Sequence, residues 1–202
     1  MSITRPLHPA LYTGLRWLVE LGFGRDIALL QPLFAGCGNT ADLGCGSAEL
    51  AAALPAAGYV GLDHDHGQLK YAATLSRAAG RSLGRAELQR LPLADAALDA
   101  LLFSKVAHHM AQDEVRSVLN EARRVTRPGG RLVIVDVYPT GHGLLHDLLV
   151  RRETGEHHRQ PAELERLAVD FGWSTLQRFD LRKPTLACYV LVLTRPNAEI
   201  RS

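Results

Sequence analysis

The chain has 202 residues, of which 47% are hydrophobic and 22% charged, as expected for one globular α/β domain with its own core. Basic and acidic residues nearly balance, and a net charge of +2 does not indicate a nucleic-acid-binding surface. No apolar run approaches the ~20 residues of a membrane span, and the first residues lack the apolar stretch of a signal peptide. The three cysteines form no CxxC pair, so neither disulfides nor structural zinc are expected, and a cytoplasmic location is predicted.

Strand and helix signals alternate along the chain. The first half of the chain predicts one or two helices within 7–35, broken near Gly22–Gly24 and Pro32, then a strand at 40–43, a helix at 48–54, a strand at 59–63, a helix at 66–79 and a weak strand at 81–86. The second half predicts a strand at 98–103, a helix with Asp113 as N-cap that stops before Pro128, and a strand at 131–137. A helix starting at Pro161 and strands at 174–180 and 185–193 complete the chain. This alternation favours a seven-stranded, mostly parallel sheet with helices on both faces. The last two strands, with no helix between them, predict an antiparallel hairpin at one edge.

The turn after the first strand is the predicted ligand site, because ligands of such sheets bind beyond the carboxyl ends of the strands. Gly44 and Gly46 let the backbone turn sharply there and let a ligand approach it closely. Asp63 ends the second strand, 21 residues after Asp42, where a carboxylate can accept hydrogen bonds from both ribose hydroxyls of a nucleoside. A tight strand-to-helix turn alone would explain the glycines, but the added acid favours a nucleoside ligand.

Glu49 bears on which nucleoside derivative binds. It occupies the position of the third glycine in the dinucleotide fingerprint, and its carboxylate in a first helical turn would repel a pyrophosphate. A cation and an amino-acid tail are compatible with nearby carboxylates. The charge pattern therefore disfavours NAD, although an NAD-dependent oxidoreductase remains the alternative in another enzyme class.

Several motifs together resemble class I methyltransferases that use S-adenosylmethionine (SAM). The motifs are Asp42-Leu43-Gly44-Cys45-Gly46, Gly61-Leu62-Asp63, Leu91-Pro92-Leu93 with Ala97-Leu98-Asp99, His108-His109 and Arg127-Pro128-Gly129-Gly130. They occur in the order and spacing of the methyltransferase type 11 subgroup, which includes the ubiquinone/menaquinone C-methyltransferases. The resemblance covers roughly residues 38–195. It implies a Rossmann-like domain spanning 1–202, with residues 1–37 as a helical segment on the substrate side.

The resemblance also implies roles for individual residues. Asp42 and the backbone of Leu43, Gly44, Cys45 and Gly46 hold the methionine part of SAM, and Asp63 holds the ribose. His64 and Glu87 face the adenine, the Leu88 N–H faces adenine N1, and Ser104 borders the methionine part. Two departures from the family pattern are Ala48 in place of the third motif glycine and Glu87 in place of the usual aspartate.

Methyl transfer from a sulfonium is an in-line displacement, so the enzyme mainly aligns the reacting atoms. A base is needed only where the acceptor must lose a proton. His108 and His109 are the candidates, because the loop after the fourth strand lines the methyl-transfer site in related enzymes; packing or capping of the next helix is the alternative role. His142 and His146 are four residues apart, but without further ligands nearby in sequence no metal site is predicted.

Two segments are expected to decide the acceptor, which we predict to be a small molecule. They are the N-terminal region 7–34 and the segment 138–160, the positions of the substrate lid in the subgroup. Because the second segment is short, we expect either an open pocket or a homodimer in which a partner completes it. Neither nucleic acid nor stable membrane insertion is expected. A SAM-binding module that has lost catalysis, serving regulation or interaction, is the alternative outside the enzymes.

Overall fold

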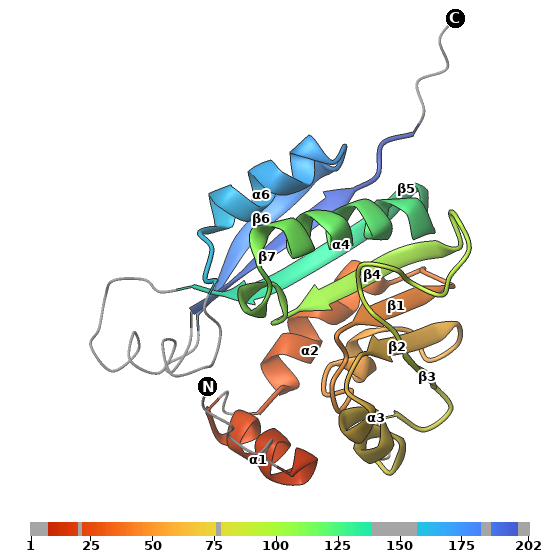
Figure 1. Cartoon of the computed structure of the whole chain (residues 1–202), viewed down its shortest axis with the longest axis vertical. Helices are drawn as coiled ribbons and strands as arrows, with labels where there is room; N and C mark the ends of the chain where they lie inside the picture. The colour runs from red at the N-terminus through yellow and green to blue at the C-terminus, as the bar shows by residue number, and fades with distance from the viewer. Residues whose placement is uncertain (1–7, 20–21, 76–77, 139–156, 183–186, 198–202) are drawn as a thin grey trace, which may run out of the picture.

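The computed structural model describes residues 8–19, 22–75, 78–138, 157–182 and 187–197. They form one seven-stranded sheet flanked by helices (Figure 1). The strands are β1 (Thr40–Leu43), β2 (Tyr59–Asp63), β3 (Ser82–Arg85), β4 (Leu98–Ser104), β5 (Thr126–Val137), β6 (Ser174–Arg182) and β7 (Ala187–Thr194). The helices are α1 (Pro9–Val19), α2 (Gly24–Leu30), α3 (His66–Ala73), α4 (Gln112–Val125) and α6 (Pro161–Asp170), with 3-10 turns η1 (Gln31–Phe34), η2 (Ala51–Ala53) and η4 (Ala107–His109).

The strand order is β3-β2-β1-β4-β5-β7-β6. Strands β1 to β5 pair in parallel, whereas β7 runs antiparallel to both β5 and β6. The predicted α/β class and the C-terminal antiparallel hairpin are thus confirmed. From β1 the strands that follow in sequence lie on one side, as β2 and β3, and from β4 they lie on the other side. The strand order therefore switches between β1 and β4, and a ligand is expected in the crevice at the carboxyl ends of these two strands.

The core lies on both faces of the sheet, because each central strand is buried on both sides. Along β4, Leu101 and Phe103 pack with α4 and α6, while Ala100 and Leu102 pack toward the side of α2, η1 and η2. Trp173 is nearly fully buried on the α4 side, and its indole N–H donates to the Leu119 carbonyl oxygen at 3.2 Å. This core holds the strand ends that carry the candidate site. Among the described residues, no helix has the length and apolar character needed to cross a bilayer.

Two local predictions are wrong. The helix expected at 48–54 is instead a series of turns followed by η2, because Ala48 has a left-handed φ of 59° that no α-helix accommodates. The N-cap of α4 is Ala111 rather than Asp113, which lies in the first helical turn. Glu114 Oε2 accepts the Ala111 N–H at 2.7 Å, so a carboxylate still satisfies a backbone donor at this helix start.

Candidate functional site

The glycine turn, residues 44–48, follows β1 and is the centre of the candidate site. Gly44 and Gly46 both have left-handed φ angles, of 72° and 52°. A Cβ on Gly44 would lie 2.4 Å from Val106 Cγ2, so the loop after β4 closes directly onto this turn. Ala48 has the same left-handed conformation, which costs an alanine about 1 kcal/mol. The backbone therefore keeps at Ala48 the conformation that suits the family's glycine, with the added methyl group fully buried.

Replacing Gly44 by alanine is expected to lower the free energy of unfolding by about 2–4 kcal/mol, since a left-handed φ and the overlap with Val106 both oppose the new Cβ. Urea denaturation followed by circular dichroism measures this change. Gly14→Ala is the control, because a Cβ there meets nothing within 4 Å. Equal stability of the Gly44 variant and the wild type would contradict the close contact.

Asp63 holds the glycine turn as well as the end of β2. Its Oδ2 accepts the Gly46 N–H and its Oδ1 accepts the Asp65 N–H, each at 2.8 Å. The Asp63 side chain is 10% exposed. Since each carboxylate oxygen has two acceptor positions, Asp63 can hold this turn and still accept ribose hydroxyls. The residue predicted to bind the ribose is thus also the support for the turn predicted to bind the methionine part.

Acidic side chains surround Cys45 in this turn. Burial, and then Asp42, Asp63 and Glu49, raise the pKa of the Cys45 thiol well above its ordinary value, so the thiol stays protonated. Asp42 is buried and accepts the Tyr59 hydroxyl at 3.2 Å. Negative charge of this density repels a pyrophosphate and attracts a cationic ligand. Cys45 is accordingly a packing residue and not a nucleophile.

Glu49 lies at the turn although no α-helix starts there. It is 6% exposed, and its Oε1 accepts the Ser47 hydroxyl at 2.8 Å. Ser47 Oγ also lies 2.7 Å from the Thr13 hydroxyl of α1. The charge argument against a pyrophosphate therefore holds through the carboxylate itself, without the helix start that the sequence predicted.

The residues expected at the adenine lie on one side of Asp63. His64 is exposed, with its Nδ1 3.4 Å from Asp63 Oδ1. The Ala86 N–H donates to the Asp63 carbonyl oxygen at 3.0 Å and so places the following turn, Glu87–Arg90, beside the end of β2. In that turn Glu87 is exposed and Leu88 is buried. The structure thus gathers the four predicted residues Asp63, His64, Glu87 and Leu88 at one end of the site.

Ser104 ends β4 next to the glycine turn. Its Oγ is buried and, among the described residues, forms no hydrogen bond. A buried hydroxyl without a partner costs free energy, so a polar ligand atom at this position would satisfy it. This orphaned hydroxyl and the glycine turn both fit the methionine part of SAM.

Lys105 and Asp26 form a buried ion pair that the sequence did not indicate. Lys105 Nζ lies 3.8 Å from Asp26 Oδ1 of α2, and both side chains are at most 5% exposed. Lys105 itself has a left-handed φ of 58°. The pair fixes α2 to the end of β4, directly after Ser104.

His108 and His109 lie in η4, but in different environments. His108 is 2% exposed and its Nδ1 lies 2.5 Å from Oδ1 of Asp136, a buried carboxylate near the end of β5. The same oxygen accepts the Val137 N–H at 2.8 Å. Asp136 therefore acts as an acceptor, which favours the tautomer with the proton on His108 Nδ1 and leaves Nε2 as the basic nitrogen. His109 is exposed, with its ring centroid 4.0 Å from that of His108.

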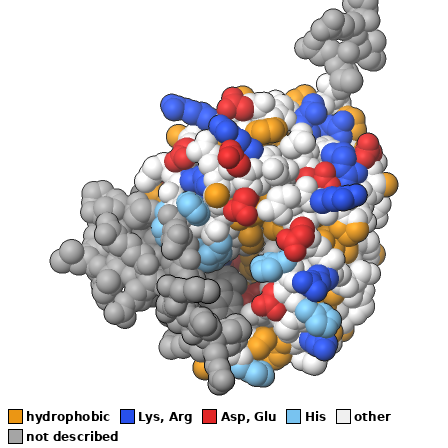
Figure 2. Space-filling model, viewed as in Figure 1, with side chains coloured by type: hydrophobic (Ala, Val, Ile, Leu, Met, Phe, Trp, Pro, Cys, Tyr) orange, Lys and Arg blue, Asp and Glu red, His pale blue; other side chains and the backbone are white. Residues whose placement is uncertain are grey.

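Arg159 braces the histidine turn. Its guanidinium donates to the carbonyl oxygens of Ala107, at 2.7 Å, and Met110, at 2.8 Å, which flank the two histidines. The His158 ring stacks on His108 at a centroid distance of 5.5 Å. Figure 2 shows histidine and acidic side chains around a hollow in the middle of the face seen in Figure 1.

Asp136 and Arg159 were missed at the sequence level. A single acid in the apolar stretch 132–137 was the available signal for Asp136, whereas nothing in the sequence linked Arg159 to His108. His142 and His146 lie outside the described residues. Within the described ranges, no cluster of three or more His, Cys, Asp or Glu side chains could hold a metal ion.

A cavity of about 330 Å³ opens elsewhere, between the start of α6 and the end of β6. Its lining residues are Gln160, Pro161, Ala162, Arg178, Phe179 and Asp180. Strands β4, β5 and β7 separate β6 from β1, so this cavity is distinct from the glycine turn. The chemistry of the glycine turn and the histidine pair identifies the candidate site better than cavity size does.

Comparisons with known proteins show that the chain is similar to methyltransferases. Residues 41–134 match the family model described as a methyltransferase domain. The ubiquinone/menaquinone biosynthesis C-methyltransferase of Syntrophotalea carbinolica is 32% identical over 157 residues, covering 72% of this chain and 65% of that protein. An uncharacterized methyltransferase of Mycolicibacterium gilvum is 40% identical over 95 residues, covering 46% of this chain and 36% of that protein. The chain thus spans less than two thirds of the length of either curated relative.

Solved structures share the fold. A SAM-dependent methyltransferase of Thermotoga maritima, described as a possible histamine N-methyltransferase, superposes with a TM-score of 0.70 at 17% identity, covering 92% of this chain and 96% of that one. At this identity the likeness establishes the fold alone. The match to the methyltransferase domain model covers residues 41–134, a stretch that contains the glycine turn, Asp63, Ser104 and the histidine pair.

Proposed function

We propose that the chain is a class I SAM-dependent methyltransferase that binds SAM at the glycine turn and transfers the methyl group to a small-molecule acceptor. Its match to the methyltransferase domain model, its similarity to a curated methyltransferase and its fold support this proposal. The observation that carries this proposal is the arrangement around Asp63. The Asp63 carboxylate accepts the Gly46 N–H of the turn, and the Asp63 carbonyl oxygen accepts the Ala86 N–H, directly before Glu87 and Leu88. One residue thereby connects the parts of the site expected to hold the methionine and adenosine halves of SAM.

The charge of the site supports SAM over NAD. SAM carries a sulfonium cation and an ammonium group, whereas NAD carries a pyrophosphate. Asp42, Glu49 and Asp63 all act on Cys45 in the glycine turn, so the local charge complements the first ligand and repels the second. Ser104 adds a buried hydroxyl ready to bond a polar ligand atom.

His108, in η4 after β4, and Asp136, near the end of β5, are the residues proposed to accept a proton from the acceptor. When bound, SAM would supply an electrophilic methyl group for transfer to the acceptor. His108 would take a proton from the acceptor at Nε2, while Asp136 stabilises the resulting imidazolium. His109, exposed and adjacent, is the alternative base.

The acceptor-binding surface is proposed to include the N-terminal segment. In α1, Leu11 and Trp17 are 53% and 58% exposed, which favours a surface-facing over a core-packing role for these two side chains. Most of the segment 138–160, including Arg151 and Arg152, lies outside the described residues. Completion of the pocket by a second subunit and a cytoplasmic location stay predictions.

Calorimetric titration tests the proposed cofactor. We expect the wild type to bind SAM and S-adenosylhomocysteine in the micromolar range or tighter and to bind NAD at least 100-fold more weakly, about 2.7 kcal/mol or more. Tight NAD binding without SAM binding would instead favour the oxidoreductase. Transfer of label from methyl-labelled SAM to a small-molecule product then distinguishes an enzyme from a SAM-binding module without catalysis.

A further inference from the structure

The segment between β3 and β4 carries the adenine-side residues and has no regular secondary structure. Its first part is fixed to β2, because the Ala86 N–H donates to the Asp63 carbonyl oxygen at 3.0 Å. The turn Glu87–Arg90 follows and is closed by the Arg90 N–H, which donates to the Glu87 carbonyl oxygen at 3.0 Å. Leu91 directly follows the turn, so the position of Leu91 helps to determine where the turn lies.

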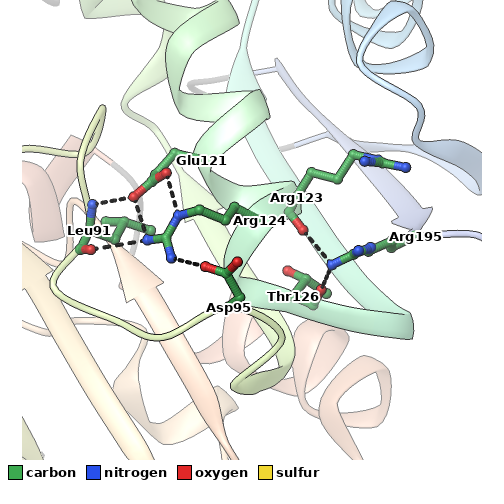
Figure 3. A network of polar contacts seen from close by, with 7 residues as sticks. All are labelled: Leu91, Asp95, Glu121, Arg123, Arg124, Thr126 and Arg195. Carbon is green, nitrogen blue, oxygen red and sulfur yellow. Dashed lines mark hydrogen bonds and ion pairs between the residues drawn. The ribbon is translucent and has the colours of Figure 1, made fainter.

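Glu121 and Arg124 of α4 hold both backbone groups of Leu91 (Figure 3). Glu121 Oε1 accepts the Leu91 N–H at 2.7 Å, and Arg124 Nη2 donates to the Leu91 carbonyl oxygen at 3.2 Å. The two side chains also bind each other, with Arg124 Nε 2.8 Å from Glu121 Oε2 and Nη2 2.7 Å from Oε1. This planar, two-bond pairing gives the clamp a defined geometry.

A third contact extends the clamp along the segment. Arg124 Nη1 lies 2.5 Å from Asp95 Oδ1, and the Arg124 carbonyl oxygen accepts the Ala96 N–H at 2.9 Å. Asp95 is 79% exposed, so its share is small. Glu121 is 13% exposed, and hydrogen bonds from Arg124 and Leu91 together lower the pKa of its carboxyl, Arg124 contributing most. The Glu121 carboxyl is therefore ionised at neutral pH, which strengthens the hydrogen bond that it accepts from the Leu91 N–H.

We propose that Glu121 and Arg124 are positioning residues that set the turn Glu87–Arg90 against the adenine of the cofactor and thereby determine its preference for adenine. The inference rests on the proposed function, in which Glu87 and Leu88 meet the adenine edge. In this proposal neither Glu121 nor Arg124 contacts the cofactor. They act through Leu91, whose backbone carries their hydrogen bonds into the turn, and through the buried Leu88 and Leu91 side chains.

The test compares two ligands by calorimetry, S-adenosylhomocysteine and S-inosylhomocysteine. In hypoxanthine an oxygen replaces the adenine amino group and N1 carries a hydrogen, so Glu87 and the Leu88 N–H each lose their match. We expect the wild type to prefer the adenine ligand by at least tenfold. In Arg124→Ala, binding of S-adenosylhomocysteine should weaken about tenfold and the preference for adenine should fall to about threefold or less.

Arg195 supplies the matched control. Its Nη1 donates to the carbonyl oxygens of Arg123 and Thr126 at the end of the same helix, at 2.9 and 2.6 Å, and no contact of Arg195 reaches Leu91 among the described residues (Figure 3). Arg195→Ala should change stability without changing the ratio of the two dissociation constants. A purely structural role of Arg124 would likewise leave this ratio unchanged.

The outcomes separate cleanly. An unaltered ratio in folded Arg124→Ala, or an equal drop in Arg195→Ala, would overturn the positioning role. If Arg124→Ala does not fold, Glu121→Gln carries the test, because glutamine keeps an acceptor for Leu91 but loses the charged pairing; its preference for adenine should drop about threefold. Absence of S-adenosylhomocysteine binding to the wild type would instead overturn the proposed function, and with it this inference.

Discussion

Asp63→Ala is expected to weaken the binding of SAM and S-adenosylhomocysteine by at least about 100-fold, the largest effect on affinity predicted for this chain. Two losses combine. Ribose hydroxyls lose a charged acceptor, which is worth roughly 1.5–3 kcal/mol per hydrogen bond. The Gly46 N–H loses its partner at 2.8 Å, so the glycine turn is no longer held in its binding conformation. Calorimetric titration of both ligands measures the change.

Asp65→Ala is the control for the Asp63 variant. Asp65 lies two residues further on, and its side chain caps α3 by accepting the N–H groups of Gly67 and Gln68 at 2.7 and 3.1 Å. Loss of this cap should cost about 1 kcal/mol of stability and leave the affinity within about twofold. If the Asp63 variant binds as tightly as the wild type, the proposed cofactor site is wrong.

His108→Ala is expected to slow methyl transfer by about 10²- to 10⁴-fold while leaving the affinity for S-adenosylhomocysteine nearly unchanged. The reason is that Asp136 orients the His108 ring and supports its positive charge once a proton is taken up. Asp136→Asn should act in the same direction, because an amide does not stabilise the imidazolium. The measurement is the initial rate with labelled SAM and the acceptor identified by mass spectrometry of its methylated product.

His109→Ala provides the comparison, since His109 is exposed and neighbours His108 in η4. Its rate should stay within about threefold of the wild type. A large loss in His109→Ala together with normal activity in His108→Ala would reverse the assignment of the base. An unchanged rate in both variants would mean that the acceptor reacts without losing a proton to either histidine.

Local sequence signals were sufficient for most of the fold. Apolar periodicity and breakers located each strand of the sheet and the helices α3, α4 and α6, because these patterns are local. The largest differences in bounds are at α3, which ends at Ala73 and not at 79, and at β5, which begins at Thr126 and not at 131. The helix expected at 48–54 was wrong since the backbone at Ala48 is left-handed. That conformation comes from the turn packed against Val106 and held by Asp63, and both contacts are distant in sequence.

The same contrast applies to the candidate site. The glycine motif, Asp63 and the histidine pair are recognisable by themselves, because their chemistry depends on residue type and short spacing. The different environments of His108 and His109 cannot be recognised in this way, since both are histidines in one motif. The difference arises from Asp136 on β5 and Arg159 before α6, which the tertiary structure brings to η4 from distant parts of the chain.

The sequence by itself determined the α/β class, the mostly parallel sheet with its antiparallel C-terminal hairpin, and the identity of the residues around the glycine turn. Alternating elements, two glycines and an acid at the end of the next strand were enough for that conclusion. Only the tertiary structure decided which side chains support the residues of the candidate site. Glu121 and Arg124 contact Leu91, which lies about 30 residues earlier in the chain, and Lys105, which follows β4, pairs with Asp26 of α2. Such pairings depend on packing between distant elements, which no local pattern encodes.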